Sequence, residues 1–180
     1  IPGHEIGATV VEVSDNVSSE IQVGMQVTVN PYSNCGRCSA CKNNRFNACR
    51  YNETMGVQRN GAMAEFIVVP AEKIIIGSSL SARELALVEP MSVGFHAVDR
   101  ALVTDNDVVL VLGCGMIGVG AIVRAALRGA TVIAVDVSNT KLELAKKLGA
   151  QFTVNSAEED LQVRLDELTS SMGADVVIEA

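Results

Sequence analysis

The sequence is poor in basic residues and in aromatic side chains, and it has no long hydrophobic run. Its 180 residues include 14 Lys and Arg against 21 Asp and Glu, which gives a net charge of −7. This charge excludes the positive footprint expected of a nucleic-acid-binding protein. The longest uncharged apolar stretch, Val108–Val123, is interrupted by glycines and is shorter than the roughly 18 residues that suggest a membrane span. We therefore expect no nucleic-acid partner and no membrane partner.

Targeting signals and a disulfide framework are also missing from the pattern. Residues Ile1–Glu5 contain neither the basic region nor the apolar region of a signal peptide, so we expect a cytoplasmic protein. Four of the five cysteines lie close together, unlike the spread-out cysteines of secreted disulfide-rich domains. Hydrophobic residues make up 48% of the chain but aromatic residues only 3%. These numbers predict an α/β protein of one or two domains with a mainly aliphatic core.

The first third of the chain has the pattern of β structure. Short alternating or β-branched runs at Ala8–Val13, Val23–Val29 and Phe66–Val69 are bounded by turn residues or proline, which predicts small antiparallel strands joined by loops. Between them, residues 31–53 form a distinct lobe that has too few apolar side chains to build its own core. Something other than hydrophobic burial must hold this lobe together.

The lobe carries the strongest chemical motif in the sequence. Its cysteines follow the spacing C-x2-C-x2-C-x7-C, at Cys35, Cys38, Cys41 and Cys49. Four thiolates at this spacing suit a closed tetrahedral zinc site, and the metal would supply the missing cohesion. Free thiols or two disulfides, and an iron–sulfur cluster, are the alternatives. The position of the fourth cysteine, with no proline after it, differs from the bacterial ferredoxin spacing, so we favour structural zinc.

From about Thr104 the rhythm changes to alternating strands and helices. This order predicts a parallel, doubly wound sheet, of which residues 104–180 supply the first mononucleotide-binding half. The expected strands are Val108–Leu112, Thr131–Val135, Phe152–Val154 and Val176–Ile178, and the expected helices are Ile117–Leu127, the segment from Ser138 to Gly149, and a segment whose apolar face comprises Leu161, Leu165, Leu168 and Met172.

A glycine-rich turn joins the first of these strands to the first helix. Gly113 permits a tight turn, Gly115 lets the backbone approach a pyrophosphate, and Gly118 allows close packing of helix and strand. Asp136 ends the next strand, where its carboxylate can accept hydrogen bonds from an adenosine ribose. The same carboxylate would repel a 2′-phosphate, so the pattern predicts NAD rather than NADP. Cys114 is expected to be a small buried residue.

The N-terminus of the same helix completes the expected phosphate site. Its first residues, Met116 and Ile117, offer backbone N–H groups and the positive end of the helix dipole to the phosphates. The alternative for this segment is a glycine turn that serves packing alone.

Three further polar residues are candidate site residues with weaker signals. His4 and Glu5 are adjacent, so on a regular strand they would point to opposite faces, and both could reach one ion only through a turn at Pro2-Gly3. Otherwise Glu5 would orient a liganding His4. Glu89 lies at the seam between the two halves of the chain, where active sites tend to form. His96 is more typical of a packed helix histidine than of a catalytic one.

Taken in order, these motifs resemble the zinc-containing medium-chain dehydrogenases, in particular the branch that includes sorbitol, threonine and sugar-acid dehydrogenases. The resemblance covers the whole chain: Gly3-His4-Glu5, the four-cysteine lobe, the Val88–Gly94 stretch, the glycine turn and Asp136. It implies a GroES-like β catalytic domain at residues 1–90, followed by a Rossmann domain at residues 91–180, both partial.

The resemblance also implies roles for individual residues. His4 matches the histidine ligand of a catalytic zinc, Glu5 matches the glutamate beside it, and Glu89 stands where typical alcohol dehydrogenases have cysteine and the polyol branch has glutamate. Lys141 matches a basic residue near the adenosine ribose, and Val93 a residue near the nicotinamide.

The sequence departs from the family pattern in two ways, because parts of the family's catalytic and cofactor domains are not present in it. The family's first catalytic ligand is a cysteine upstream of the GHE motif, and the second half of the cofactor domain is missing, so we expect an internal portion of a longer enzyme. For the intact protein the resemblance implies a zinc-dependent, NAD-linked oxidoreductase that acts on a secondary alcohol such as a polyol or sugar acid and forms a homodimer or homotetramer. A zinc-independent reductase and a non-catalytic dinucleotide-binding module are the alternatives.

Overall fold

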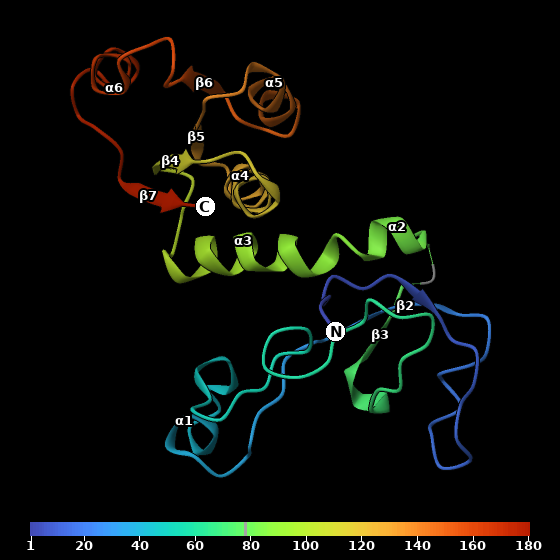
Figure 1. The fold of residues 1–180 in the computed structure, drawn as a ribbon. Coiled ribbons are helices and arrows are strands. Elements are labelled where there is room, and N and C mark those ends of the chain that lie inside the picture. Colours follow the sequence, from blue (N-terminus) through green and yellow to red (C-terminus); the bar gives the residue numbers. More distant parts are fainter. Residues whose placement is uncertain (78) are drawn as a thin grey trace. The chain divides into compact units, whose positions relative to one another are not determined.

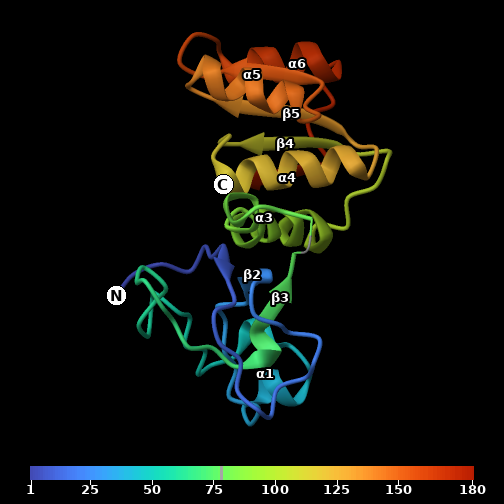
Figure 2. The same ribbon diagram turned by 90° about the vertical axis from the view of Figure 1, so that its right-hand side faces the viewer.

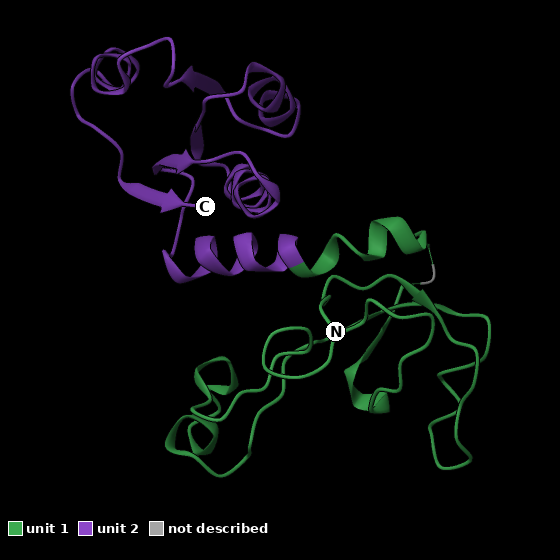
Figure 3. Ribbon diagram, viewed as in Figure 1, with its two compact units in different colours: residues 1–89 green, residues 90–180 purple. Residues whose placement is uncertain are grey.

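The protein consists of two compact units, which are described separately below. The structure is a computed structural model that describes residues 1–77 and 79–180. Unit 1 comprises Ile1–Glu89 and unit 2 comprises Pro90–Ala180 (Figure 3). The unit boundary lies inside helix α3, Val88–Arg100, directly after Glu89. In the described part of the chain, no helix combines the length and the apolar character needed to cross a membrane.

Unit 1 is built around a small antiparallel sheet. The central strand is β2, Gln26–Val29, and it pairs with β1, Ala8–Thr9, on one side and with β3, Ile74–Ile76, on the other (Figure 1). Val29 packs with Ile6 and Met55 in the core of this unit. The rest of the unit is mainly loop, with short helical turns α1 (Ser39–Lys42), η1 (Phe46–Ala48), η2 (Ala71–Lys73) and α2 (Ala82–Leu85).

The sequence predictions for unit 1 need correction at the ends and at one strand. Strand β1 covers only the first two residues of the predicted Ala8–Val13, and β2 begins three residues later than predicted. The prediction of a strand at Phe66–Val69 is wrong: within the described residues this segment has no paired neighbour, and Val68 is 99% exposed. A β-branched run shows which residues suit a pleated surface, but a strand forms only where a neighbour satisfies its backbone.

Unit 2 is a parallel sheet covered by helices on both faces. Its strand order is β6-β5-β4-β7, so the first strand of the unit lies between the second and the fourth. The elements are β4 (Val108–Leu112), α4 (Met116–Leu127), β5 (Thr131–Asp136), α5 (Asn139–Lys147), β6 (Phe152–Asn155), α6 (Leu161–Thr169) and β7 (Val176–Glu179). Figures 1 and 2 show α4 and α5 on one side of the sheet and α6 on the other. This is the strand order of a mononucleotide-binding half, in which ligands bind beyond the carboxyl ends of the strands.

The core of unit 2 confirms the predicted doubly wound fold. Val109 and Val111 of β4 are fully buried with Ile122 and Ala125 of α4 on one face of the sheet. On the other face, Leu161, Leu165 and Leu168 of α6 pack against Leu110, Ile133, Val135 and Val154. The continuous apolar run of β4 is therefore explained by burial on both faces.

One residue of the predicted α6 face lies elsewhere. Met172 is outside α6 and is 85% exposed, because the helix ends at Thr169 and the next residue, Ser170, adopts a left-handed backbone with φ of 53°. A non-glycine residue in this conformation ends the helical repeat. The apolar spacing therefore continues in the sequence for one turn after the helix has stopped.

Candidate functional sites

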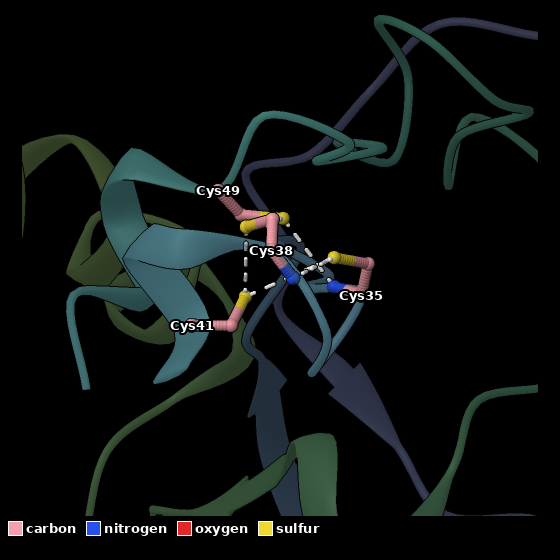
Figure 4. Close-up of side chains that lie close together, drawn as sticks. All are labelled: Cys35, Cys38, Cys41 and Cys49. Atoms are coloured by element: carbon pink, nitrogen blue, oxygen red, sulfur yellow. Dashed lines mark hydrogen bonds between the residues drawn. The ribbon is translucent and has the colours of Figure 1, made fainter. Parts of the chain in front are cut away.

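The four cysteines of the lobe converge on one point. Every pair of their sulfur atoms lies within 4.8 Å (Figure 4). The sulfur of Cys38 is 3.5 Å from that of Cys41 and 3.9 Å from that of Cys49, and the sulfurs of Cys35 and Cys41 are 4.0 Å apart. A tetrahedron with zinc–sulfur bonds of about 2.3 Å has edges of about 3.8 Å. The sulfur positions thus fit a single tetrahedral zinc ion.

Backbone N–H groups of the lobe point at the sulfurs. The N–H groups of Cys35 and Tyr51 donate to the sulfur of Cys49, each at 3.3 Å, and the N–H of Cys38 donates to the sulfur of Cys35 at 3.4 Å. Such donors favour thiolates over thiols. Backbone N–H groups, with that of Cys41 first, lower the pKa of Cys38 to about 6, whereas burial raises the pKa of Cys41 to about 11.

The arrangement speaks against two disulfides and is compatible with a metal on the four cysteines. None of the five cysteines forms a disulfide, and between Cys35 and Cys49 only Cys41 and Cys49 are buried. The lobe therefore lacks both a covalent link and a hydrophobic core of its own. A metal bound by the four sulfurs would hold the lobe together.

A second cluster of possible ligands contains His4, Glu5 and Glu89. One side-chain ligand atom from each lies within 4.8 Å of the others. The Nε2 atom of His4 is 3.9 Å from Oε2 of Glu89. In a tetrahedral site with zinc–nitrogen and zinc–oxygen bonds of about 2.1 Å the two ligand atoms are about 3.4 Å apart, so a shift of about half an ångström would let one ion contact both atoms. Glu5 is the exposed member of the cluster and Glu89 the buried one.

The backbone of unit 1 holds His4 in place by anchoring the residues before it. Gly3 has a φ of +103°, which permits a turn before His4. The N–H groups of Gly61, Ala62 and Met63 donate to the carbonyl groups of residues 1–3 at 2.7 to 3.0 Å. His4 and Glu5 are thus outside any regular strand, and the opposed orientation expected on a strand does not apply to them.

Glu89 is the only charged residue among those that are buried in the described part of the chain. It lies in the first turn of α3, where a negative side chain is favoured by the helix dipole. A buried carboxylate is costly unless it is paired or hydrogen-bonded. Its partners include the His4 imidazole and the hydroxyl of Tyr32, which donates to Oε1.

Tyr32 was not predicted from the sequence as a site residue. It follows β2 at the start of the cysteine lobe, and its hydroxyl reaches Glu89, which lies 57 positions later in the chain. Burial, together with the hydrogen bond and the charge of Glu89, raises the pKa of Tyr32 to about 12, so the hydroxyl keeps its proton. The only signal available was the scarcity of tyrosine, which occurs twice in the chain.

In unit 2, the three glycines of the turn after β4 have three different environments. Gly113 has a φ of +94°. A Cβ atom at Gly118 would collide with the carbonyl oxygen of Gly113, whereas a Cβ at Gly115 would meet no atom within 4 Å. Gly115 is also the N-cap of α4, without a side-chain cap. The turn therefore leaves open space at the start of a helix, as a phosphate group requires.

Asp136 is held beside this turn at the end of β5. Its Oδ2 accepts a hydrogen bond from the N–H of Cys114 at 2.8 Å, and its Oδ1 accepts from the N–H of Ser138 at 2.9 Å. The ammonium group of Lys141 is 3.6 Å away. Burial opposes the charge, but these N–H groups and Lys141 outweigh it and hold the pKa of Asp136 below its usual range. The carboxylate is thus ionised and fixed next to the glycine turn.

The remaining predicted residues fall on the same unit. Met116 and Ile117 begin α4 and are partly exposed, at 41% and 40%, and Val93 on α3 is 37% exposed. Cys114 is buried, as predicted. His96 lies on α3 but is exposed, so the prediction of a packed histidine is wrong.

Comparison with known protein families identifies both halves of the chain. Residues 1–78 match the family described as alcohol dehydrogenase GroES-like domain, and residues 117–180 match the family described as zinc-binding dehydrogenase. These matches cover the segments that carry His4, the cysteine lobe and Asp136.

Curated relatives cover nearly the whole chain. The erythritol/L-threitol dehydrogenase of Mycolicibacterium smegmatis is 40% identical over 99% of the chain and 51% of its own length. The sorbitol dehydrogenase of Bacillus subtilis is 35% identical over 99% of the chain and 51% of its own length. The chain therefore spans about half the length of the curated relatives it matches.

Solved structures show the same fold. An Escherichia coli oxidoreductase/dehydrogenase of unknown specificity superposes with a TM-score of 0.93 at 33% identity, over 99% of this chain and 52% of that one. A zinc-binding dehydrogenase of Sinorhizobium meliloti, with a TM-score of 0.88, 33% identity and coverage of 99% and 53%, was solved with NADP. An alcohol dehydrogenase of E. coli CFT073, described as short chain, was solved with NADH, with a TM-score of 0.88, 28% identity and coverage of 100% and 53%.

Proposed function

The chain belongs to the zinc-containing medium-chain dehydrogenases of the alcohol dehydrogenase superfamily, and from this premise we propose that the protein is a zinc-dependent, NAD-linked dehydrogenase of a polyol, sugar acid or similar secondary alcohol. The observation that carries the proposal is the pairing of His4 with Glu89, whose ligand atoms are 3.9 Å apart although they come from opposite ends of unit 1's sequence. Residues 1–89 would form the catalytic unit and residues 90–180 the cofactor-binding unit.

The residues of unit 1 would hold two zinc ions for different purposes. Four cysteines close the lobe site, which is typical of structural zinc. His4 and Glu89 would hold the second ion, with Glu5 either as a third ligand or as the residue that orients His4. When bound there, zinc would supply a Lewis acid that lowers the pKa of a substrate hydroxyl. Glu89 contributes a negative charge where a cysteine ligand would also contribute one, but through an oxygen atom.

The residues of unit 2 would bind and orient the dinucleotide. The open space at Gly115 and the start of α4 at Met116 and Ile117 would receive the pyrophosphate, and Val93 would lie near the nicotinamide ring, which accepts the hydride. Asp136 is ionised and rigidly held, so it would accept hydrogen bonds from ribose hydroxyls and repel a 2′-phosphate. This supports NAD over NADP. Lys141 would contribute to the same ribose site.

Ligand chemistry and composition support the proposed substrate class. Histidine and carboxylate ligands together make a site suited to oxygen-rich substrates. The chain contains no Trp, 4 Phe and 2 Tyr, which leaves few aromatic side chains for an apolar substrate pocket. The curated relatives named above are polyol dehydrogenases, which agrees with this argument.

The experiment that tests the proposal is a substrate panel with NAD, run on the full-length enzyme before and after treatment with a chelator. We expect turnover of polyols or sugar acids, little turnover of ethanol, and loss of activity when the metal is removed. Chelator-insensitive turnover would instead support a zinc-independent reductase, and a preference for simple primary alcohols would overturn the substrate class.

The Glu89→Ala variant distinguishes the proposed role of unit 1 in catalysis from the proposed role of unit 2 in NAD binding. Glu89→Ala should lower the turnover number while leaving NAD affinity unchanged, because the residues proposed to bind the dinucleotide lie in unit 2. The matched control is Glu65→Ala, at an exposed glutamate of unit 1 outside the His4 cluster, which should retain activity. Full activity of Glu89→Ala would show that this carboxylate has no part in the reaction.

A further inference from the structure

The sequence motifs did not reveal the contact between Glu89 and Tyr32. Because of this contact, the two carboxylate oxygens of Glu89 have different partners. Oε1 accepts the hydrogen bond from the Tyr32 hydroxyl, and Oε2 faces Nε2 of His4 at 3.9 Å. The carboxylate thus has a distinct partner on each oxygen. A carboxylate whose one oxygen is engaged by a hydroxyl presents the other oxygen in a fixed direction.

The tyrosine that makes this contact is itself fixed by its backbone. Its N–H donates to Oδ1 of Asn30 at 3.0 Å, and its carbonyl accepts from Nζ of Lys73 at 2.7 Å. The carbonyl of the preceding residue, Pro31, accepts from the N–H of Met55 at 3.0 Å. Asn30 directly follows β2, and Lys73 directly precedes β3. The backbone of Tyr32 is therefore anchored beside the sheet of unit 1, and its hydroxyl extends from there to Glu89.

We propose that Tyr32 is a positioning residue that holds Glu89 so that Oε2 alone is directed toward the metal position beside His4. This inference rests on the proposed zinc site. Residues that hydrogen-bond to a metal ligand fix its orientation, and their loss typically lowers metal affinity about 10- to 100-fold.

The chain offers a matched control for this role. Tyr51 is the other tyrosine, and its ring lies under the guanidinium groups of Arg37 and Arg50 in the cysteine lobe. Tyr51→Phe removes one hydroxyl from the same unit but keeps the ring and its contacts. Tyr32→Phe likewise keeps the ring and removes only the hydroxyl that Glu89 accepts from.

The experiment measures zinc binding to the metal-free protein by competition with a chromogenic chelator, without substrate or turnover. We expect the wild type to bind two zinc ions per chain and Tyr32→Phe to bind one of them at least tenfold more weakly. Tyr51→Phe should differ from the wild type by less than threefold. Thermal unfolding of the zinc-loaded proteins serves as the check that Tyr32→Phe is folded.

A second background distinguishes positioning from a general structural effect. In Glu89→Ala there is no carboxylate to orient, so adding Tyr32→Phe should change zinc affinity by less than twofold. An equal loss in both backgrounds, or unchanged affinity of Tyr32→Phe in the wild-type background, would overturn the role of Tyr32 alone. Binding of only one zinc ion by the wild type would refute the proposed catalytic zinc site, and the inference with it.

Discussion

Replacing one cysteine of the lobe should unfold the lobe without unfolding the sheet of unit 2. Cys38 is the informative position because its sulfur is close to those of both Cys41 and Cys49. Serine in its place keeps the size but loses the thiolate ligand, and the tetrahedron is left with three sulfurs. A closed site that loses one of its four thiolates loses much of its affinity for zinc.

The magnitude follows from what else holds the lobe. Structural zinc contributes on the order of 10 kcal/mol in peptide-scale domains, whereas whole domains are stable by only about 5–15 kcal/mol. Between Cys35 and Cys49 only two residues are buried, and both are ligands. The loss of zinc therefore exceeds any hydrophobic stabilisation that the segment retains, and the segment should unfold locally.

Hydrogen exchange and metal analysis are the measurements that check this prediction. Cys38→Ser should release one zinc per chain and abolish protection of the amides in residues 35–51, while the amides of β4 and β5 keep their protection. The matched control is Cys114→Ala, since Cys114 is the fifth cysteine, is buried in unit 2 and lies outside the cluster. Full zinc content with unchanged exchange in Cys38→Ser would refute the reasoning, as would an iron–sulfur absorbance band in the wild type.

Three further predictions concern unit 2. Asp136→Ala should weaken NAD binding by about one to two orders of magnitude, as expected for the loss of a charged hydrogen bond of roughly 1.5–3 kcal/mol. It should also reduce the difference in affinity between NAD and NADP. Equal affinity of the wild type for both cofactors in a binding titration would contradict this prediction. Gly115→Ala should weaken NAD binding with little loss of stability, because the added Cβ meets open space. Gly118→Ala should lower the free energy of unfolding by about 1–3 kcal/mol, because its Cβ meets the Gly113 carbonyl. Denaturant unfolding and NAD titration of both variants test this contrast. Finally, the pKa of Asp136 is lower in the native state than in the unfolded state, so the carboxylate stabilises the fold above the unfolded pKa of about 3.9 and loses this effect as the pH falls through the native pKa. The difference in unfolding free energy between wild type and Asp136→Asn should therefore shrink between pH 7 and pH 3. A difference that stays constant with pH would contradict this prediction.

The fold of unit 2 could be predicted from the sequence because its signals are local. Val108–Leu112 is apolar throughout since the strand is buried on both faces, and Gly113 and Gly118 of the turn each meet a distinct backbone requirement. The end of α6 was misplaced, because an apolar spacing does not register the left-handed backbone at Ser170, and His96 was wrongly expected to be packed. Local signals of this kind are sufficient where each residue's environment is set by its own element.

Unit 1 was less predictable because its structure depends on contacts between distant segments. The run Phe66–Val69 has the composition of a strand, but its neighbours in the described chain do not pair with it. The spacing of the four cysteines indicated the lobe correctly, since all four ligands lie in one short segment. The contact of Tyr32 with Glu89 has no such local pattern: it joins the end of β2 to the first turn of α3.

The buried carboxylate of Glu89 connects these observations to function. A carboxylate that served only to begin a helix would be expected at the surface, where it keeps its contact with water, but Glu89 is 8% exposed. The imidazole and the hydroxyl beside it partner this charge in the fold, and a cation bound there would share the charge as well. An apolar residue at position 89 would satisfy packing at lower cost. The proposed zinc ion, which His4 and Glu89 would hold together, accounts for a buried charged side chain in this position.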